Sequence, residues 1–345
     1  MQVLSITSMR NEGPFCLEWI AHHLAAGVGH FLIYSNDCDD GTDIMLDELA
    51  AAGIVTHVPQ HPDGRHTVQW QALRHAAKHA LYKQSDWVLV SDCDEFINLR
   101  TSGATLQDLI AALPVDTDAL AMPWRLFGNS GLITASDDLT IARFTRAAPE
   151  DIGLPLAHFF KSLFRPKAFR QIGVHRPKRK KDTAPVWVDG GGNRFSANFA
   201  TMDHRINLFG LPNSRDLIQL NHYSVRSAQE FMVKRTRGLP NHTGREIGLG
   251  YWTERNFNTV QDDSILPMLA ATRSELDRLL GLGRLVELQQ QSRDIHRAKF
   301  EKQMENRGEV QLLWQLGLSA GSRPPSAEFS QAQLQRMARA GNANG

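Results

Sequence analysis

The stretch VLVSDCDEFINL, Val88 to Leu99, places an apolar run directly before three acidic residues. The run WVLV at 87–90 has the composition of a strand that is buried on both faces of a sheet. Asp92, Asp94 and Glu95 follow at once, where such a strand would end. Two like charges about 4 Å apart repel by about 4 kcal/mol at an effective dielectric constant near 20. A core strand that ends in this much negative charge therefore requires a compensating partner.

Composition limits what kind of protein this is. The 345 residues suffice for one large domain, or for a domain with an extension, and 38 Lys and Arg balance 37 Asp and Glu. This balance gives no reason to expect a nucleic-acid partner. The three cysteines are widely separated and odd in number, which argues for a reducing compartment rather than a disulfide framework. With no signal peptide and no apolar run of about 18 residues, we expect a cytoplasmic location.

The first hundred residues alternate between strand-like and helix-like segments. This order predicts an α/β fold with a mainly parallel sheet and helices on both faces. The stretch quoted first is the fourth expected strand. The preceding expected strands are 3–7, 30–35 and 54–58. Three helices are expected as well: the first begins at Pro14, the second ends at Gly53 and the third spans 67–82.

Polar clusters follow three of the expected strands. In parallel α/β sheets, ligands bind beyond the carboxyl ends of the strands, so we expect these clusters to form one site. Each cluster also has a structural interpretation, since Asp40 could cap a helix and Asp94 could sit in a turn. The clusters are Arg10, Asn11 and Glu12; Asp39 and Asp40; and Asp92, Asp94 and Glu95.

The acids of the quoted stretch suggest a divalent cation. Mg²⁺ and Mn²⁺ take oxygen ligands and commonly bridge protein carboxylates to substrate phosphates. In an extended strand Asp92 and Asp94 would face the same side, and Cys93 the other. A cation between the carboxylates would make their charge tolerable, and Cys93 is then expected to be a small packed residue.

The remainder of the chain is less regular. Arg176–Lys181 holds five basic residues in six, typical of a solvated loop, with contact to anionic lipid or a pyrophosphate as the alternative. Beyond residue 226 the pattern becomes helical, and the end of the chain carries little apolar character. We therefore expect a domain at 1–226, a helical extension at 227–318 and a partly disordered tail at 319–345.

Several motifs, in order, resemble a known group of enzymes. They are RNEGPFCLEWIAHHLAAGVGHFLIYSNDCDDGT (10–42), DWVLVSDCDEFINL (86–99) and NHYSVRSAQEFMVKRTRG (221–238). Together they resemble the bacterial family-2-like glycosyltransferases of the GT-A fold, whose motifs also occur in glycosyltransferase family 92. The resemblance implies a Rossmann-like, mainly parallel sheet flanked by helices, with a helical C-terminal extension.

The resemblance also implies a reaction and its ligands. Such enzymes transfer a sugar from a nucleotide donor, most often a uridine diphosphate sugar, with Mn²⁺ or Mg²⁺. Asp92 and Asp94 match the DxD motif, and His222 matches a further metal-ligand position, so these three form the expected metal site. The expected donor-binding residues are Arg10, Asn11, Glu12, Asp39, Asp40, Gln71, Arg74, Asp92 and Lys161.

The base that would activate the acceptor is the weakest part of the resemblance. Inverting transfer needs a carboxylate or imidazole base. No ED motif followed by QxxRW is present, so the base of family 2 enzymes has no counterpart here. Asp263 and, second to it, Asp262 are the candidates, although Asp263 is equally suited to precede a helix.

Competing interpretations remain open from the sequence. A non-catalytic protein of the same fold could bind a sugar nucleotide or glycan without turnover. A haloacid-dehalogenase-type phosphotransferase needs its DxD on the first strand, and the HAAKH segment lacks the Glu of a zinc-hydrolase motif. For the transferase, the expected acceptor is a glycan, a lipid-linked oligosaccharide or a protein. Peripheral contact with the inner face of a membrane would run through Arg176–Lys181.

Overall fold

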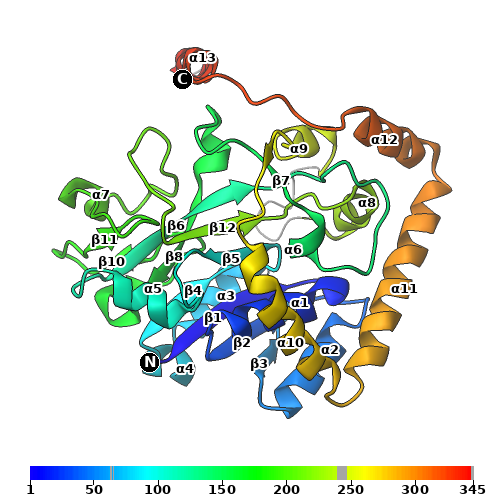
Figure 1. The fold of residues 1–345 in the computed structure, drawn as a ribbon, viewed down its shortest axis with the longest axis horizontal. Helices are drawn as coiled ribbons and strands as arrows, with labels where there is room; N and C mark the ends of the chain where they lie inside the picture. Colours follow the sequence, from blue (N-terminus) through cyan, green and yellow to red (C-terminus); the bar gives the residue numbers. More distant parts are fainter. Residues whose placement is uncertain (63, 65, 239–246, 343–345) are drawn as a thin grey trace.

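The structure, a computed structural model, describes residues 1–62, 64, 66–238 and 247–342. Its main sheet is built from β1 (Val3–Met9), β2 (His30–Ser35), β3 (Val55–Pro59), β4 (Trp87–Val90), β5 (Glu95–Leu99), β6 (Ala119–Leu126), β8 (Phe160–Phe164), β11 (Trp187–Val188) and β12 (Ile218–His222). The strand order is β3-β2-β1-β4-β8-β6-β12-β5, and β11 pairs with β6 (Figure 1). Two small sheets pair β7 (Arg146–Ala147) with β13 (Val260–Gln261), and β9 (Phe169–Gln171) with β10 (Lys178–Arg179).

Helices cover both faces of this sheet. Side chains alternate along each strand, so on β2 Ile33 packs toward one helical layer and Leu32 toward the other. The layer beside Ile33 contains α1 (Gly13–Ala25), α2 (Thr42–Ala51), α5 (Leu106–Ala112) and α10 (Leu269–Leu280). The opposite layer contains α3 (Val68–Ala76), α4 (Ala80–Gln84) and α7 (Ala197–Thr201).

The remaining helices lie mostly toward the C-terminus. They are α6 (Thr140–Arg143), α8 (Ala228–Arg237), α9 (Leu249–Thr253), α11 (Leu285–Met304), α12 (Arg307–Leu318) and α13 (Ala327–Asn342), with 3₁₀ turns at Pro155–His158, Pro166–Ala168 and Leu266–Met268. Figure 1 shows α11 along one side of the molecule and α13 at the end of a long connection from α12. Within the part of the chain described, no helix is both long enough and apolar enough to cross a bilayer.

Strand directions decide where the site forms. The pairs β3-β2, β2-β1 and β1-β4 are all parallel, so the carboxyl ends of these strands meet at one edge. β12 runs parallel to β6 and antiparallel to β5, with His222 opposite Glu95. The end of β12 therefore lies beside the start of β5, which brings residues after 222 to the acids at 92–95.

Two expected elements are divided in the structure. The expected single helix at 67–82 is split into α3 and α4, because the imidazole of His79 accepts a hydrogen bond from the Leu81 backbone and starts a new helix. The quoted stretch is two strands, not one, because the chain turns at Ser91–Asp94 between β4 and β5.

The C-terminal helices share the core of the sheet. α10 packs along α1, and Leu276, Leu279, Leu285 and Leu288 belong to the same buried cluster as the strands. Core packing therefore continues across residue 226. The division into domains at this residue stays a prediction. In the tail, α13 occupies part of the expected disordered segment; residues 343–345 lie outside the described residues.

Candidate functional site

The acidic turn between β4 and β5 is closed by its own backbone. The Glu95 amide donates to the Asp92 carbonyl at 3.0 Å, and the Asp92 amide donates to a carboxylate oxygen of Glu95 at 2.9 Å. In this turn the strand alternation fails, so Asp92 and Asp94 have different partners instead of sharing one side. The expected extended geometry of Asp92 and Asp94 is therefore wrong, because the chain turns there, and a metal ion shared by the two carboxylates stays a prediction.

Asp92 is paired with a buried lysine. Lys161 Nζ, on β8, donates to Asp92 at 2.9 Å and lies 3.4 Å from Glu95, and Gln69 Nε2 donates to Asp92 at 2.9 Å. Burial alone would lower the pKa of Lys161, but the charges of Asp92 and Glu95 outweigh it and raise this pKa. The Asp92 side chain remains 35% exposed, so it can still meet a ligand.

Glu95 is fully buried and belongs to the framework of the turn. Its carboxylate accepts hydrogen bonds from Trp124 Nε1 at 2.8 Å and from the Asp92 amide. Burial raises the pKa of Glu95 well above its usual range. Glu95 therefore holds the turn in shape rather than facing a ligand.

Asp94 lies between a lysine and a histidine. Lys234 Nζ, on α8, donates to Asp94 Oδ2 at 2.7 Å, while His222 Nε2 is 3.6 Å from Oδ1, too far for a hydrogen bond. Burial would raise the pKa of Asp94, but Lys234 and then His222 hold it well below its usual range. Burial lowers the pKa of His222, which favours the neutral imidazole that a metal ligand requires.

A second group of charges adjoins this turn. Arg237 donates a hydrogen bond to Glu12, and Arg226 Nη1 lies 3.7 Å from the same carboxylate. Arg226 also donates to the Cys93 carbonyl at 3.2 Å, and its guanidinium stacks 3.6 Å above the ring of Phe15. The backbone of Arg226 has φ of +52°, a conformation that side-chain-bearing residues rarely adopt and that often marks functional sites.

These contacts explain how the negative charge at the end of β4 is compensated. The four acids at this edge face four cationic side chains, so protein groups compensate the negative charge. The acids are Glu12, Asp92, Asp94 and Glu95, and the cations are Lys161, Arg226, Lys234 and Arg237. Cys93 itself is buried in the core, as expected, and burial raises its pKa well above the usual range.

The residues after β1 and β2 have mainly protein partners. Asn11 Oδ1 accepts from the Asp39 amide at 2.9 Å, and Arg10 donates to the Arg237 carbonyl at 3.1 Å. The Asp39 side chain is 67% exposed and forms an ion pair with Lys299 of α11. Both loops thus reach the same edge as the acidic turn, and Asp39 stays accessible there.

Asp40 differs from its neighbour because its carboxylate is fully buried. It accepts hydrogen bonds from the amides of Gly13 and Thr42, which begin α1 and α2, and from His296 Nε2 at 2.8 Å. Burial would raise the pKa of Asp40, but His296 and Thr42 lower it to about 2. These contacts favour the capping role over contact with a nucleoside.

The two expected residues of α3 do not converge on the acids. Gln71 Nε2 donates to the His61 carbonyl at 2.7 Å, and Arg74 is exposed. Gln69, two residues earlier, is the α3 side chain that reaches Asp92.

The two candidate bases, Asp262 and Asp263, differ in their surroundings. Asp262 accepts from Gln219 at 3.1 Å and lies 3.3 Å from Arg125 Nε. Gln219 and His222 are three positions apart on β12 and so face opposite sides of the strand. Asp263 is exposed just before the 3₁₀ turn at Leu266–Met268. Asp262 therefore contacts the side of β12 opposite to His222, and the base remains a prediction.

The basic run at 176–181 is largely engaged within the protein. Arg176 is buried, donates to the Phe199 carbonyl at 2.6 Å and stacks on Trp187. Lys178 Nζ donates to the Asp203 carbonyl at 2.7 Å. Lys180 and Lys181 are exposed, so these two would carry any contact with a membrane surface.

The fit of a divalent metal rests on Asp94 and His222. Their facing atoms are a carboxylate oxygen and an imidazole nitrogen, a donor pair that suits Mn²⁺. In the described residues, this site included, no group of three His, Cys, Asp or Glu side chains is placed to hold a metal ion. Asp94 and His222 would hold such an ion, the other positions would fall to the donor or water, and Asp92 is paired with Lys161.

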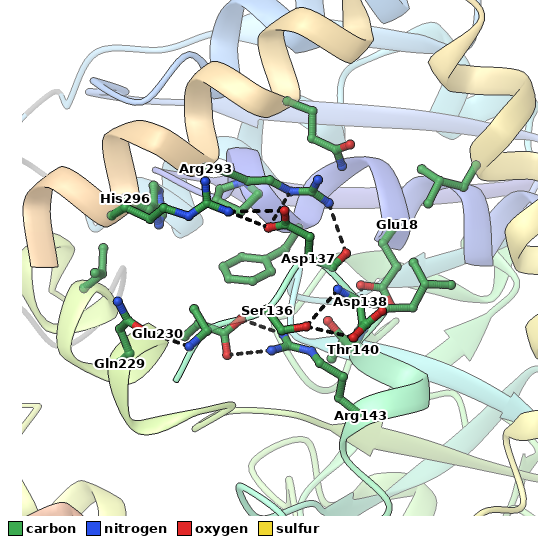
Figure 2. A pocket seen from close by; sticks show the side chains of 18 residues that line it. Glu18, Ser136, Asp137, Asp138, Thr140, Arg143, Gln229, Glu230, Arg293 and His296 are labelled. Atoms are coloured by element: carbon green, nitrogen blue, oxygen red, sulfur yellow. Dashed lines mark hydrogen bonds and ion pairs between the residues drawn. The ribbon is translucent and has the colours of Figure 1, made fainter. Parts of the chain in front are cut away.

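Two adjoining hollows lie beside α8. One, of about 380 Å³ including open solvent, is lined by Glu12, Arg226, Lys234, Arg237 and Lys299. A larger one, of about 680 Å³ including open solvent, shares Phe15, Glu230, Val233 and His296 with the first. Figure 2 shows the larger hollow, where the Arg143–Glu230 ion pair lies across from Asp137 and Arg293. The smaller hollow is the one connected to the acidic turn, because Lys234, which contacts Asp94, lines it together with Arg226 and Arg237.

The roles of several site residues could not be predicted from the sequence. Gln69, Arg226, Lys234 and Arg237 contact the acidic edge, yet only their motifs, not their roles, are visible in the sequence. The spacing of Lys234 and Arg237, one helical turn apart, was the available signal. The fold and the site thus define an α/β protein that gathers acids, a neutral histidine and anion-binding cations at the carboxyl edge of its sheet.

Comparisons with known proteins identify the family. The model of glycosyltransferase family 92 matches residues 14–189, just over half of the chain. A family 92 protein of Ricinus communis is 33% identical over 108 residues, which are 30% of this chain and 18% of that protein. One of Arabidopsis thaliana is 28% identical over 178 residues, 47% of this chain and 28% of that protein. The chain belongs to glycosyltransferase family 92, and its match spans less than a third of these curated relatives.

Solved structures add little at this distance. TarS 1-349 of S. aureus aligns with a TM-score of 0.36 and 11% identity, covering 88% of this chain and 92% of that one. The same protein in complex with UDP aligns with a TM-score of 0.32 and 14% identity, covering 49% and 48%. The expected fold class is confirmed by the sheet itself, with its parallel half, its two helical layers and its helical C-terminal region.

Proposed function

We propose that this chain is a metal-dependent glycosyltransferase that moves a sugar from a uridine diphosphate donor to a hydroxyl of a glycan, lipid-linked or protein acceptor. One observation carries the proposal: Asp94, His222 and the cations Lys234, Arg226 and Arg237 converge at the carboxyl edge of the sheet. Family membership supports the reaction class.

The charge of the reaction suits this edge. As the glycosidic bond breaks, the departing nucleoside diphosphate gains negative charge on its terminal phosphate. Cationic side chains stabilise such charge, and Lys234, Arg226 and Arg237 line the hollow beside α8. A divalent cation held by Asp94 and His222 would supply further electrostatic stabilisation when bound.

The acceptor side of the reaction is less defined. We propose that the sugar is transferred with inversion, for which a base must take the proton of the acceptor hydroxyl. Asp263 and Asp262 stay predictions for this base; Asp263 is exposed, whereas Asp262 is held by Gln219. Trp124 is buried between Glu95 and His222, so it supports the site from within the core.

The donor class is tested by thermal unfolding with Mn²⁺ and UDP, GDP, CDP or ADP. A nucleotide at a hundred times its dissociation constant stabilises the folded protein by about 2.7 kcal/mol, a readily measured shift. We expect UDP to raise the midpoint for the wild type and for Asp277→Ala, an exposed control on α10. Asp94→Ala should lose the shift.

Turnover is tested separately by donor hydrolysis with a panel of UDP-sugars. Release of UDP by the wild type but not by Asp94→Ala would support catalysis. Nucleotide binding without release or transfer would instead favour a binding protein of the same fold. If no nucleotide shifts the midpoint, the donor-site proposal fails.

A further inference from the structure

Lys234 occupies an unusual position for a lysine. Its side chain is only 10% exposed, and its ammonium donates to Asp94 at 2.7 Å and to the Ser224 carbonyl at 2.8 Å. Lys234 lies on α8, whose N-terminus is fixed by a reciprocal cap between Ser227 and Glu230. A rigid helix thus delivers a cation to the second acid of the DxD motif.

The two carboxylate oxygens of Asp94 therefore differ in their contacts. Its Oδ2 is bound by the ammonium, whereas its Oδ1 faces His222 Nε2 across 3.6 Å with no hydrogen bond between them. The Nδ1 atom of His222 is buried without a hydrogen-bond partner, so no contact described here fixes the ring in one tautomer. A divalent ion between Asp94 and His222 would stand next to the ammonium, and like charges so close repel each other strongly.

The neighbouring hollow offers the ammonium another partner. Lys234, Arg226 and Arg237 all line it, and each is now satisfied by an acid of the protein. A diphosphate there would present several anionic oxygens to the three cations. Lysine suits such an exchange, because its compact ammonium carries three donors on a flexible stem.

We propose that Lys234 is an exchangeable counter-ion of Asp94. In the protein without ligands its ammonium neutralises Asp94; when a divalent cation takes that place, the ammonium turns to the donor diphosphate. This inference rests on the proposed function, since it assumes a nucleotide diphosphate in the hollow. Metal and nucleotide then strengthen each other's binding by the same factor.

The test measures Mn²⁺ binding by electron paramagnetic resonance and UDP binding by calorimetry. Lys234→Met removes the ammonium but keeps the stem, and Lys302→Met, exposed on α11, is the matched control. Without UDP, Lys234→Met should bind Mn²⁺ at least tenfold more tightly than the wild type or the control. With saturating Mn²⁺, Lys234→Met should bind UDP at least tenfold more weakly than the wild type, whereas in buffer with EDTA the two should differ by less than twofold.

The effect of UDP on Mn²⁺ binding can be measured in the wild type as well as in the variant. UDP should tighten Mn²⁺ binding to the wild type at least tenfold, and by a clearly smaller factor in Lys234→Met, where only direct contact between the ion and the diphosphate would remain. A wild type that binds UDP yet holds Mn²⁺ equally tightly with and without it overturns the inference, even if Lys234→Met does not fold. So does a folded Lys234→Met with unchanged or weaker Mn²⁺ binding. If no nucleotide binds, the proposed function is wrong. In that case tighter Mn²⁺ binding by Lys234→Met would still support exchange of cations at Asp94.

Discussion

Single residues at the carboxyl edge show how burial and charge are reconciled. Removing one partner of a buried ion pair typically costs about 3 to 5 kcal/mol, because the other charge is left without compensation. Lys161 is fully buried against Asp92 and Glu95, so this lysine is as necessary to the turn as the acids are. The carboxylates of Asp92 and Asp94 are thus members of internal ion pairs.

The same reasoning yields a pH dependence at Asp40. The pKa of Asp40 falls from 3.8 to about 2 in the folded protein, so the stability it contributes is complete above pH 4 and is lost as pH falls toward 2. We expect urea unfolding between pH 5 and pH 2 to show that the wild type loses about 2 kcal/mol more than Asp40→Asn. Asp277→Asn, at an exposed site, should follow the wild type. Parallel pH profiles for wild type and Asp40→Asn would contradict the assignment.

Sequence alone located the acids but not their partners. Asp92, Asp94 and His222 belong to recognisable motifs, and two of them do face each other. Lys234 is 140 residues from Asp94, and lysines are rarely buried, so neither spacing nor composition could pair them. The turn at Ser91–Asp94 was hidden as well, since the apolar residues on both sides of it read as one strand.

At the scale of elements, α8 connects the fold to the site. It follows β12, whose pairing with β5 and β6 fixes the direction of the chain, and it carries both Lys234 and Arg237. Its motif was recognisable, whereas its position depends on the pairing of β12, which involves residues more than a hundred positions apart.

The cap of α8 gives a prediction at this scale. Ser227 Oγ accepts from the Glu230 amide at 3.3 Å, and Glu230 accepts from the Ser227 amide at 2.9 Å. Ser227→Ala should lower the free energy of unfolding by about 1 kcal/mol, as the loss of an N-cap usually does. Ser274→Ala, exposed inside α10, should change it by less than about 0.5 kcal/mol. Equal effects of the two substitutions in urea denaturation would show that the cap contributes nothing.

For the molecule as a whole, the order of elements was more predictable than its division into parts. The alternation of strands and helices in the first hundred residues correctly indicated a mainly parallel sheet with two helical layers, and the antiparallel strands β5 and β8 lie in its other half. The boundary at residue 226 rested on a change of pattern from mixed to helical. Packing runs across it, because α10 lies along α1 and fills the core beneath the sheet.

This shared core predicts that the sheet and the C-terminal helices unfold together. Leu279 of α10 is fully buried in the cluster that also holds Trp19 of α1 and Trp87 of β4. Leu279→Ala should lower the free energy of unfolding by about 2 to 5 kcal/mol, the range for a leucine removed from a packed core. Leu334→Ala, on the exposed part of α13, should change it by less than about 0.5 kcal/mol.

Two probes of the same denaturation distinguish one cooperative unit from two. Far-UV circular dichroism follows the helices, and tryptophan fluorescence follows buried residues such as Trp19 and Trp87. In Leu279→Ala both transitions should move together to lower urea, because the substitution removes contacts that the sheet and α10 share. Loss of helix before any change in fluorescence would show that residues beyond 226 form a separate unit. The substitution should then leave the stability of the sheet unchanged, and the continuous core would have no energetic consequence.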